Sequence, residues 1–144
     1  MTKPLVFLGG TAGKNHWRHG FIERLGARGV PKAGLFDPVV ADWDDAARER
    51  EERAKADAEV LLFYLGNPEE PELHVSSFGL VEATLSVCRE PQRTIAVFDA
   101  DSVSGHARKV YAQTAKLLRA QRTKALIFDS LREAEDALVR RFAV

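Results

Sequence analysis

Residues 60–65 read Val-Leu-Leu-Phe-Tyr-Leu, an unbroken run of apolar and aromatic side chains. A run that is apolar at every position, instead of at every second one, is typical of a strand covered on both faces within a parallel sheet. Four further short apolar runs lie on either side of it, at residues 5–8, 34–36, 94–98 and 125–128. The sequence therefore predicts five buried strands.

Segments with helical periodicity separate these runs. One such segment places Trp17, Phe21 and Leu25 on a common face, and another does the same for Leu131 and Leu138. Strands that alternate with helices form parallel sheets through right-handed crossovers. We therefore expect an α/β protein with a flavodoxin-like, doubly wound five-stranded parallel sheet between two helix layers. The strand order 2-1-3-4-5 is expected by analogy with known sheets of this kind.

Length and composition restrict the class of protein further. The chain has 144 residues without an internal repeat or a linker, so we expect a single domain over residues 1–144. Its 21 basic residues balance 21 acidic ones, and a net charge of zero gives no general attraction to extended nucleic acid. One cysteine excludes an internal disulfide, and no stretch has the length of a signal peptide core or a membrane span. These features predict a cytoplasmic protein without a membrane partner.

A glycine-rich turn follows the first strand. Residues 9–15 read Gly-Gly-Thr-Ala-Gly-Lys-Asn and lead into the first helix. Ligands of doubly wound sheets bind beyond the carboxyl ends of the strands, and glycine lets the backbone approach them closely. The spacing fits neither a P-loop nor a dinucleotide-binding motif. We predict that Gly9, Gly10 and Thr11 contact a sugar or a phosphate; the alternative is a tight turn without a ligand.

The loop after the second strand also lies at the carboxyl ends of the strands, and it carries two further candidates, Asp37 and Trp43. An aromatic side chain there can stack against a flat ligand such as a nucleobase. Packing of Trp43 between the second helix and the sheet is an equally good interpretation.

Two carboxylates are the candidates for chemistry. Glu82 lies in the opening turns of the third helix among apolar neighbours, where an acidic side chain is costly unless it is used or paired. The alternative is a charge that interacts with the helix dipole. Glu49 precedes Asp57 by eight residues, which is about 12 Å along the second helix at 1.5 Å per residue. It therefore lies nearer the carboxyl ends of the strands, where ligands bind. We therefore predict Glu49, and not Asp57, as the second acid.

The histidines do not predict a metal site. His16 and His19 are three residues apart, but no third ligand has a suitable spacing. Ser76 with His74 lacks the motif of a nucleophilic serine. A phosphoacceptor receiver domain is disfavoured, because such a domain needs an acidic pair after its first strand and this chain has glycines there. We predict neither a metal nor another cofactor.

Taken together, the segments from residue 6 to about residue 97 resemble the nucleoside 2-deoxyribosyltransferase-like family, which is related to the deoxynucleoside monophosphate N-glycosidases. The matching features are Val6 to Thr11 with Trp17, Phe36-Asp37-Pro38 with Trp43, Glu49 eight residues before Asp57, and Ser76 six residues before Glu82. None of these motifs is specific alone, and their order and spacing carry the resemblance.

This resemblance implies an enzyme of nucleotide metabolism. Glu82 matches the family nucleophile, Glu49 the second carboxylate, and Ser76 a residue that binds sugar or phosphate. Gly10 and Thr11 match the loop around the deoxyribose. The expected reaction is cleavage or transfer at the N-glycosidic bond of a nucleoside or nucleotide through a glycosyl-enzyme intermediate. The family also implies a homodimer or a larger homo-oligomer.

Two other functions would use the same predicted cleft. One is an NAD or nucleotide glycohydrolase of the TIR-like kind, which also uses a glutamate on a flavodoxin-like sheet. The other is a nucleotide-binding sensor that retains the cleft and has lost turnover.

Overall fold

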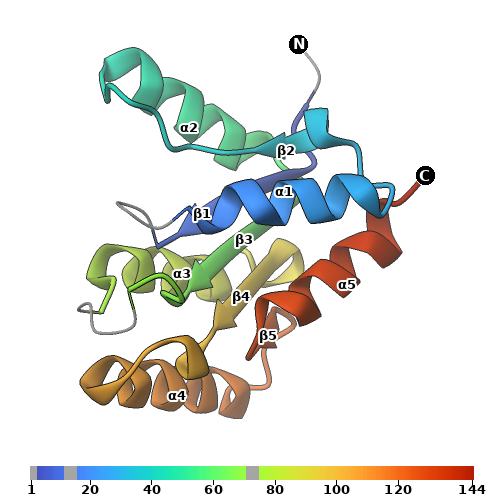
Figure 1. Ribbon diagram of the computed structural model, residues 1–144. Helices are drawn as coiled ribbons and strands as arrows, with labels where there is room; N and C mark the ends of the chain where they lie inside the picture. Colours follow the sequence, from blue (N-terminus) through green and yellow to red (C-terminus); the bar gives the residue numbers. More distant parts are fainter. Residues whose placement is uncertain (1–2, 12–15, 71–74) are drawn as a thin grey trace.

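The computed structural model describes residues 3–11, 16–70 and 75–144. Its centre is a five-stranded parallel sheet in the order β2-β1-β3-β4-β5, which confirms the expected flavodoxin-like α/β fold (Figure 1). The strands are β1 (Val6–Gly10), β2 (Leu35–Phe36), β3 (Val60–Leu65), β4 (Thr94–Phe98) and β5 (Leu126–Phe128). Every residue of β3 and β4 is buried, as their continuous apolarity predicts.

In the described part of the chain, five α-helices and three short 3-10 helices connect or follow the strands. They are α1 (Trp17–Ala27), η1 (Lys32–Gly34), α2 (Asp45–Asp57), α3 (Ser77–Arg89), η2 (Pro91–Arg93), η3 (Ala100–Ser102), α4 (Gly105–Ala120) and α5 (Leu131–Phe142). Among these elements no helix combines the length and hydropathy needed to cross a lipid bilayer.

The side chains of the sheet alternate between two hydrophobic clusters. One cluster, which includes Leu8 and Leu62, packs against α1 and α5. The other, which includes Phe7 and Phe63, packs against α2, α3 and α4. Helices therefore cover both faces of the sheet, which gives the three layers that the sequence predicts (Figure 1).

Helix α2 has the weakest apolar face of the five. Asp44 begins it by accepting a hydrogen bond from the Ala47 backbone N–H at 2.7 Å. Its buried side chains are only Ala47 and Ala54. Because alanine fills little volume, α2 leaves space between itself and the neighbouring elements, and clefts lie along it.

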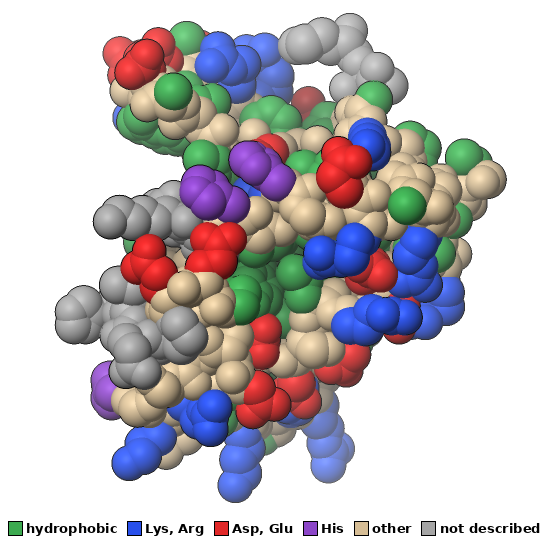
Figure 2. Space-filling model, viewed as in Figure 1, with side chains coloured by type: hydrophobic (Ala, Val, Ile, Leu, Met, Phe, Trp, Pro, Cys, Tyr) green, Lys and Arg blue, Asp and Glu red, His purple; other side chains and the backbone are tan. Residues whose placement is uncertain are grey.

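Surface charges of both signs are interspersed over α1 and α5 in Figure 2, and basic side chains project from α4 below them. Glu135 of α5 is the buried member of this set. Its carboxylate accepts hydrogen bonds from Arg24 of α1 at 2.8 Å and from Arg28, the C-cap residue of α1, at 2.5 Å. This ion-pair cluster links the two helices of one layer.

Candidate functional site

A cleft of about 280 Å³ lies between α2 and α3, at the carboxyl end of β1. Its volume is close to the lower end of the range for small-molecule sites, about 300–1000 Å³. The residues that line it come from strands, loops and three helices: Phe7, Gly9, Gly10, Arg18, Pro38, Val39, Val40, Trp43, Glu51, Phe78 and Glu82. It therefore lies where doubly wound folds bind their ligands.

Glu82, the predicted nucleophile, lies on the side of α3 that faces this cleft. Its side chain is 19% exposed, and its carboxylate accepts a hydrogen bond from the Lys55 ammonium group at 2.5 Å. Gly79, three residues earlier, is buried. A Cβ atom there would lie 2.8 Å from the Ser76 hydroxyl and 3.3 Å from Leu65, and at an ordinary contact distance of 3.5 Å from the Gly10 backbone. The glycine thus lets the first turn of α3 pack against the end of β3, which brings Glu82 close to the glycine turn.

The second carboxylate of the cleft is Glu51. Its side chain is also 19% exposed, and it pairs with Lys55 at 3.5 Å. Glu49 is exposed and is not among the residues that line the cleft. Two residues correspond to about 200° around a helix axis, so the two side chains lie on different faces of α2.

The sequence contains a signal for Glu51 that the prediction of Glu49 overlooked. Glu51 lies four residues after the buried Ala47 and three before the buried Ala54, on the face that packs inward.

Lys55 lies between the two carboxylates. Burial lowers its pKa, but the hydrogen bond to Glu82 and the charges of Glu82 and Glu51 outweigh this effect, so that the pKa is raised from 10.5. Its Nζ atom also lies 5.4 Å from the centre of the Phe7 ring. Lys55 is therefore a fixed cation that holds two acidic groups of different helices beside each other.

Arg18 is the buried cation of the site, at 3% exposure. Its guanidinium group donates to the carbonyl oxygens of Leu8 and Thr11 at 2.8 Å and of Gly10 at 3.3 Å. Burial lowers its pKa to about 10, although the charges of Asp37, Glu51 and Glu82 oppose this shift. Arg18 thus fixes the backbone of the glycine turn from below and adds positive charge to the wall of the cleft.

The glycine turn contributes Gly9 and Gly10 to the cleft. Gly10 has φ = +103°, and a Cβ atom there would overlap the Tyr64 backbone. Thr11, the third predicted contact of this turn, is buried and does not line the cleft. Its backbone N–H donates to the Tyr64 carbonyl at 2.8 Å, and its hydroxyl accepts from Gly66 N–H at 3.4 Å. Thr11 therefore joins β1 to the end of β3; residues 12–15 lie outside the described part of the chain.

Of the two predicted residues after β2, Trp43 lines the cleft and Asp37 does not. The Asp37 carboxylate accepts from Val39 N–H at 2.9 Å and lies 3.8 Å from the Arg18 guanidinium group. It shapes the loop whose next residues, Pro38, Val39 and Val40, form part of the wall. Its role in this structure is to position that loop.

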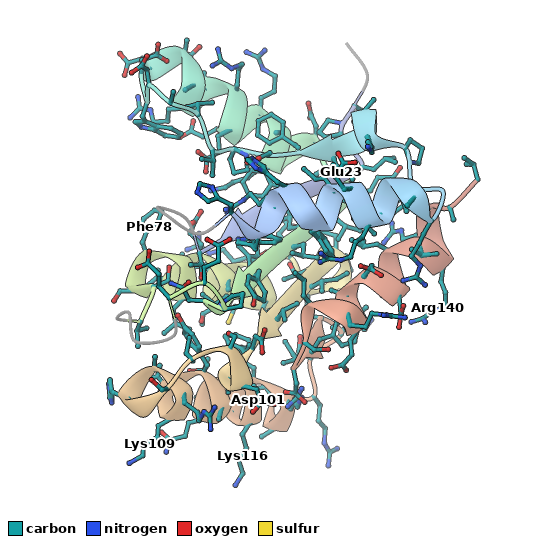
Figure 3. All side chains as sticks on the ribbon, in the orientation of Figure 1. Glu23, Phe78, Asp101, Lys109, Lys116 and Arg140 are labelled. Carbon is teal, nitrogen blue, oxygen red and sulfur yellow. The ribbon has the colours of Figure 1, made fainter. Side chains whose placement is uncertain are left out.

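Trp43 and Phe78 provide exposed aromatic surface at the cleft. The Trp43 side chain is 57% exposed and the Phe78 side chain, labelled in Figure 3 at the start of α3, is 76% exposed. Exposed apolar groups that rim a concave surface are typical of ligand-binding grooves. Phe78 was not predicted to be a cleft residue.

Ser76 directly precedes α3 as its N-cap residue. Its backbone N–H donates to the Tyr111 hydroxyl at 3.0 Å, and it does not line the cleft. The structure thus brings Gly9, Gly10, Trp43 and Glu82 together, whereas Glu49, Thr11, Asp37 and Ser76 lie outside the cleft wall.

Metal ligands do not gather in the described part of the chain: no three His, Cys, Asp or Glu side chains there form a cluster that could hold an ion. The rings of His16 and His19 stack on each other with their centroids 5.8 Å apart. His74, considered above with Ser76, lies outside the described residues.

No family model matches this chain, and neither the curated proteins nor the solved structures contain a match to it. The case for a function therefore depends on the site itself.

Proposed function

We propose that this chain cleaves or transfers the N-glycosidic bond of a nucleoside or nucleotide, with Glu82 as nucleophile and Glu51 as second carboxylate. The observation that carries the proposal is the meeting of these two acids, from different helices, at one cleft that also contains a glycine turn and exposed aromatic rings. This replaces Glu49, which was predicted from the sequence, with Glu51 in the role of the second acid.

The reaction takes place in two displacements. A carboxylate oxygen of Glu82 bonds to the anomeric carbon, the bond from that carbon to the base nitrogen breaks, and the base leaves with the electron pair and takes up a proton. Water or a second base then bonds to the same carbon, releases Glu82 as a carboxylate and loses a proton. The anomeric configuration is retained because it is inverted twice.

The two carboxylates of the cleft suit a transition state with positive charge on the sugar. Negative groups near the anomeric carbon stabilise an oxocarbenium-like state, and Glu82 and Glu51 supply them. Lys55 contacts both carboxylates and holds them in place. Glu51 is then free to accept a hydrogen bond from a sugar hydroxyl or to assist protonation of the leaving base.

The aromatic residues fit the other half of the substrate. Trp43 and Phe78 offer flat apolar surface for a nucleobase, and Gly9 and Gly10 allow close approach of the sugar to the backbone. We therefore propose a small nucleoside or nucleotide as the ligand, with no requirement for a metal in the reaction.

A second candidate function is supported by the ion pair between Lys55 and Glu82. An ammonium group 2.5 Å from a carboxylate offsets its negative charge and lowers its nucleophilicity. The chain would then bind a nucleotide without consuming it, as a sensor.

We also propose that the chain acts as a homodimer or a larger homo-oligomer. Phe78, Val81 and Leu85 of α3 are exposed large apolar side chains spaced three and four residues apart, so they lie on one face of the helix. Burial of such a face against a second copy would remove apolar surface from water beside the cleft.

The test is base release from a panel of nucleosides, nucleoside 5′-monophosphates and NAD, followed by chromatography. We expect the chain to release the base from one of these classes of compound. Glu82→Gln should lower the rate of base release by about 10³-fold or more, while the circular dichroism spectrum stays native. A glycosyl group on Glu82, detected as a mass increase, would support the intermediate. Unchanged turnover in Glu82→Gln would reject the assignment. A raised melting temperature without base release would instead identify a sensor.

A further inference from the structure

A second and larger cleft, of about 470 Å³, lies at the edge of the sheet on the other side of α2. Phe36 of β2, whose side chain points to the α2 side of the sheet, provides the apolar floor, and Arg50 and Arg53 of α2 form part of the wall. None of the reasoning above assigns it a role. Its volume falls within the range of about 300–1000 Å³ that is usual for small-molecule sites.

The cause of this cleft is the alanine face of α2. Ala54 is the α2 residue that meets the sheet edge here, and its single methyl group cannot fill the space above Phe36. Helix α2 is nevertheless fixed at this end, because the Arg93 guanidinium group donates to the carbonyl oxygens of Lys55 at 2.8 Å and Ala58 at 2.7 Å. The space is therefore part of the folded chain and not the result of a free helix end.

Positive charge surrounds the apolar floor. Lys3, Arg50 and Arg53 line the cleft, against one acidic residue, Asp57. Within residues 3–11, 16–70 and 75–144, none of these three cations has an ion-pair partner. Each guanidinium group offers five N–H donors in a planar fork that suits a carboxylate, a phosphate or a sulfonate.

We propose that this cleft binds a small aromatic anion, with the acidic group on Arg50 and Arg53 and the flat apolar body on Phe36. A peptide added as a further strand is disfavoured because β2 has only two residues and offers few backbone hydrogen bonds. A second copy of the chain is disfavoured because a twofold contact would bring like charges together.

The two clefts share a wall, so the experiment must separate them. Glu51 of α2 lines the candidate active site, and Phe7, which lines the same site, stacks on Phe36 with ring centroids 5.9 Å apart. A probe that binds beside Trp43 and Phe78 would report on the wrong cleft. Variants of both clefts are therefore compared.

The probe is 1-anilinonaphthalene-8-sulfonate, titrated into the full chain and followed by fluorescence. We expect saturable binding that weakens about tenfold or more in Arg50→Gln/Arg53→Gln, since hydrogen bonds to a charged group are lost. Arg48→Gln/Arg89→Gln has the same change in net charge at positions that line neither cleft, and should bind normally. Raised salt should weaken binding to the original chain.

A second variant fills part of the cleft without changing the net charge of the chain. Ala33 is exposed and lines the cleft, so Ala33→Leu adds volume over the floor with little effect on folding. It should also weaken binding, whereas Trp43→Ala and Phe78→Ala should not. Equal weakening by both arginine pairs, or weakening by the aromatic variants alone, would overturn the proposal. So would a dimer that dissociates in Arg50→Gln/Arg53→Gln. All of these results are independent of base release.

Discussion

Glu49 and Glu51 carry the same charge two residues apart on α2, but their surroundings differ. Glu51 is mostly buried beside Lys55 and lines the candidate active site, whereas Glu49 is exposed. A carboxylate near the reacting sugar can act in hydrogen bonding and proton transfer, and one in solvent cannot. The face of the helix, and not proximity in sequence, decides which of the two lines the cleft.

The two glutamates form a matched pair for mutation. Glu51→Gln should lower kcat for base release by about 10²-fold or more, the lower end of the usual effect of an acid-base group. Glu49→Gln should change kcat by less than about twofold, as expected of an exposed side chain outside the cleft. Steady-state kinetics of both variants decides the assignment, and a large loss in Glu49→Gln with none in Glu51→Gln would reverse it.

At the scale of an element, α2 is fastened at its C-terminal end more than along its length. Its inward side chains are alanines, and the last carbonyl groups have no partner within the helix. Arg93 of η2 supplies two hydrogen bonds to them, one of which fixes the backbone of Lys55. The cation between Glu51 and Glu82 is therefore positioned by a residue outside the cleft.

Replacement of this arginine tests the arrangement. Arg93→Gln should lower the free energy of unfolding by about 1–3 kcal/mol, because two carbonyl groups lose a charged donor. Urea unfolding followed by circular dichroism measures this change. Arg89→Gln removes a nearby exposed charge at the end of α3 and serves as the control. Equal stability of the two variants would show that α2 does not depend on Arg93.

At the scale of the whole molecule, the layer formed by α1 and α5 depends on one buried acid. Glu135 lies against Arg24 and Arg28, and these ion pairs join segments more than one hundred residues apart. Burial raises the pKa of Glu135, but the two arginines outweigh it, so the pKa is lowered from 4.5. The folded state therefore favours the ionised form more than the unfolded state does.

Because the pKa of Glu135 is lower in the folded than in the unfolded state, the free energy of unfolding depends on pH. The stabilisation from Glu135 is fully present above pH 4.5, the unfolded pKa, and is lost as the pH falls through the lower folded pKa. Glu135→Gln should therefore reduce the urea midpoint near pH 7 and have a smaller effect near pH 3. Glu23→Gln, at an exposed glutamate of α1, is the comparison. A deficit in Glu135→Gln that stays constant with pH would contradict this role.

Much of the fold follows from local patterns. Continuous apolar runs gave β3 and β4 with their observed bounds, since strands covered on both faces need no polar positions. The edge strands were less well predicted: β2 has two residues, and Leu126 of β5 is 45% exposed. At a sheet edge one neighbour is missing, so the apolar pattern constrains the strand less.

The sequence by itself determined the alternation of strands and helices, because periodicity is a property of neighbouring residues. It also pointed to the glycine turn and to Glu82 as parts of one rim. The spacing of Glu51 from two alanines indicates its side of α2, but only the tertiary structure decided that Lys55 pairs with both Glu51 and Glu82 and that Arg18 supports the turn. The contact between Lys55 and Glu82 joins two helices across 27 residues, and the rotation of α2 that permits it depends on packing across the sheet.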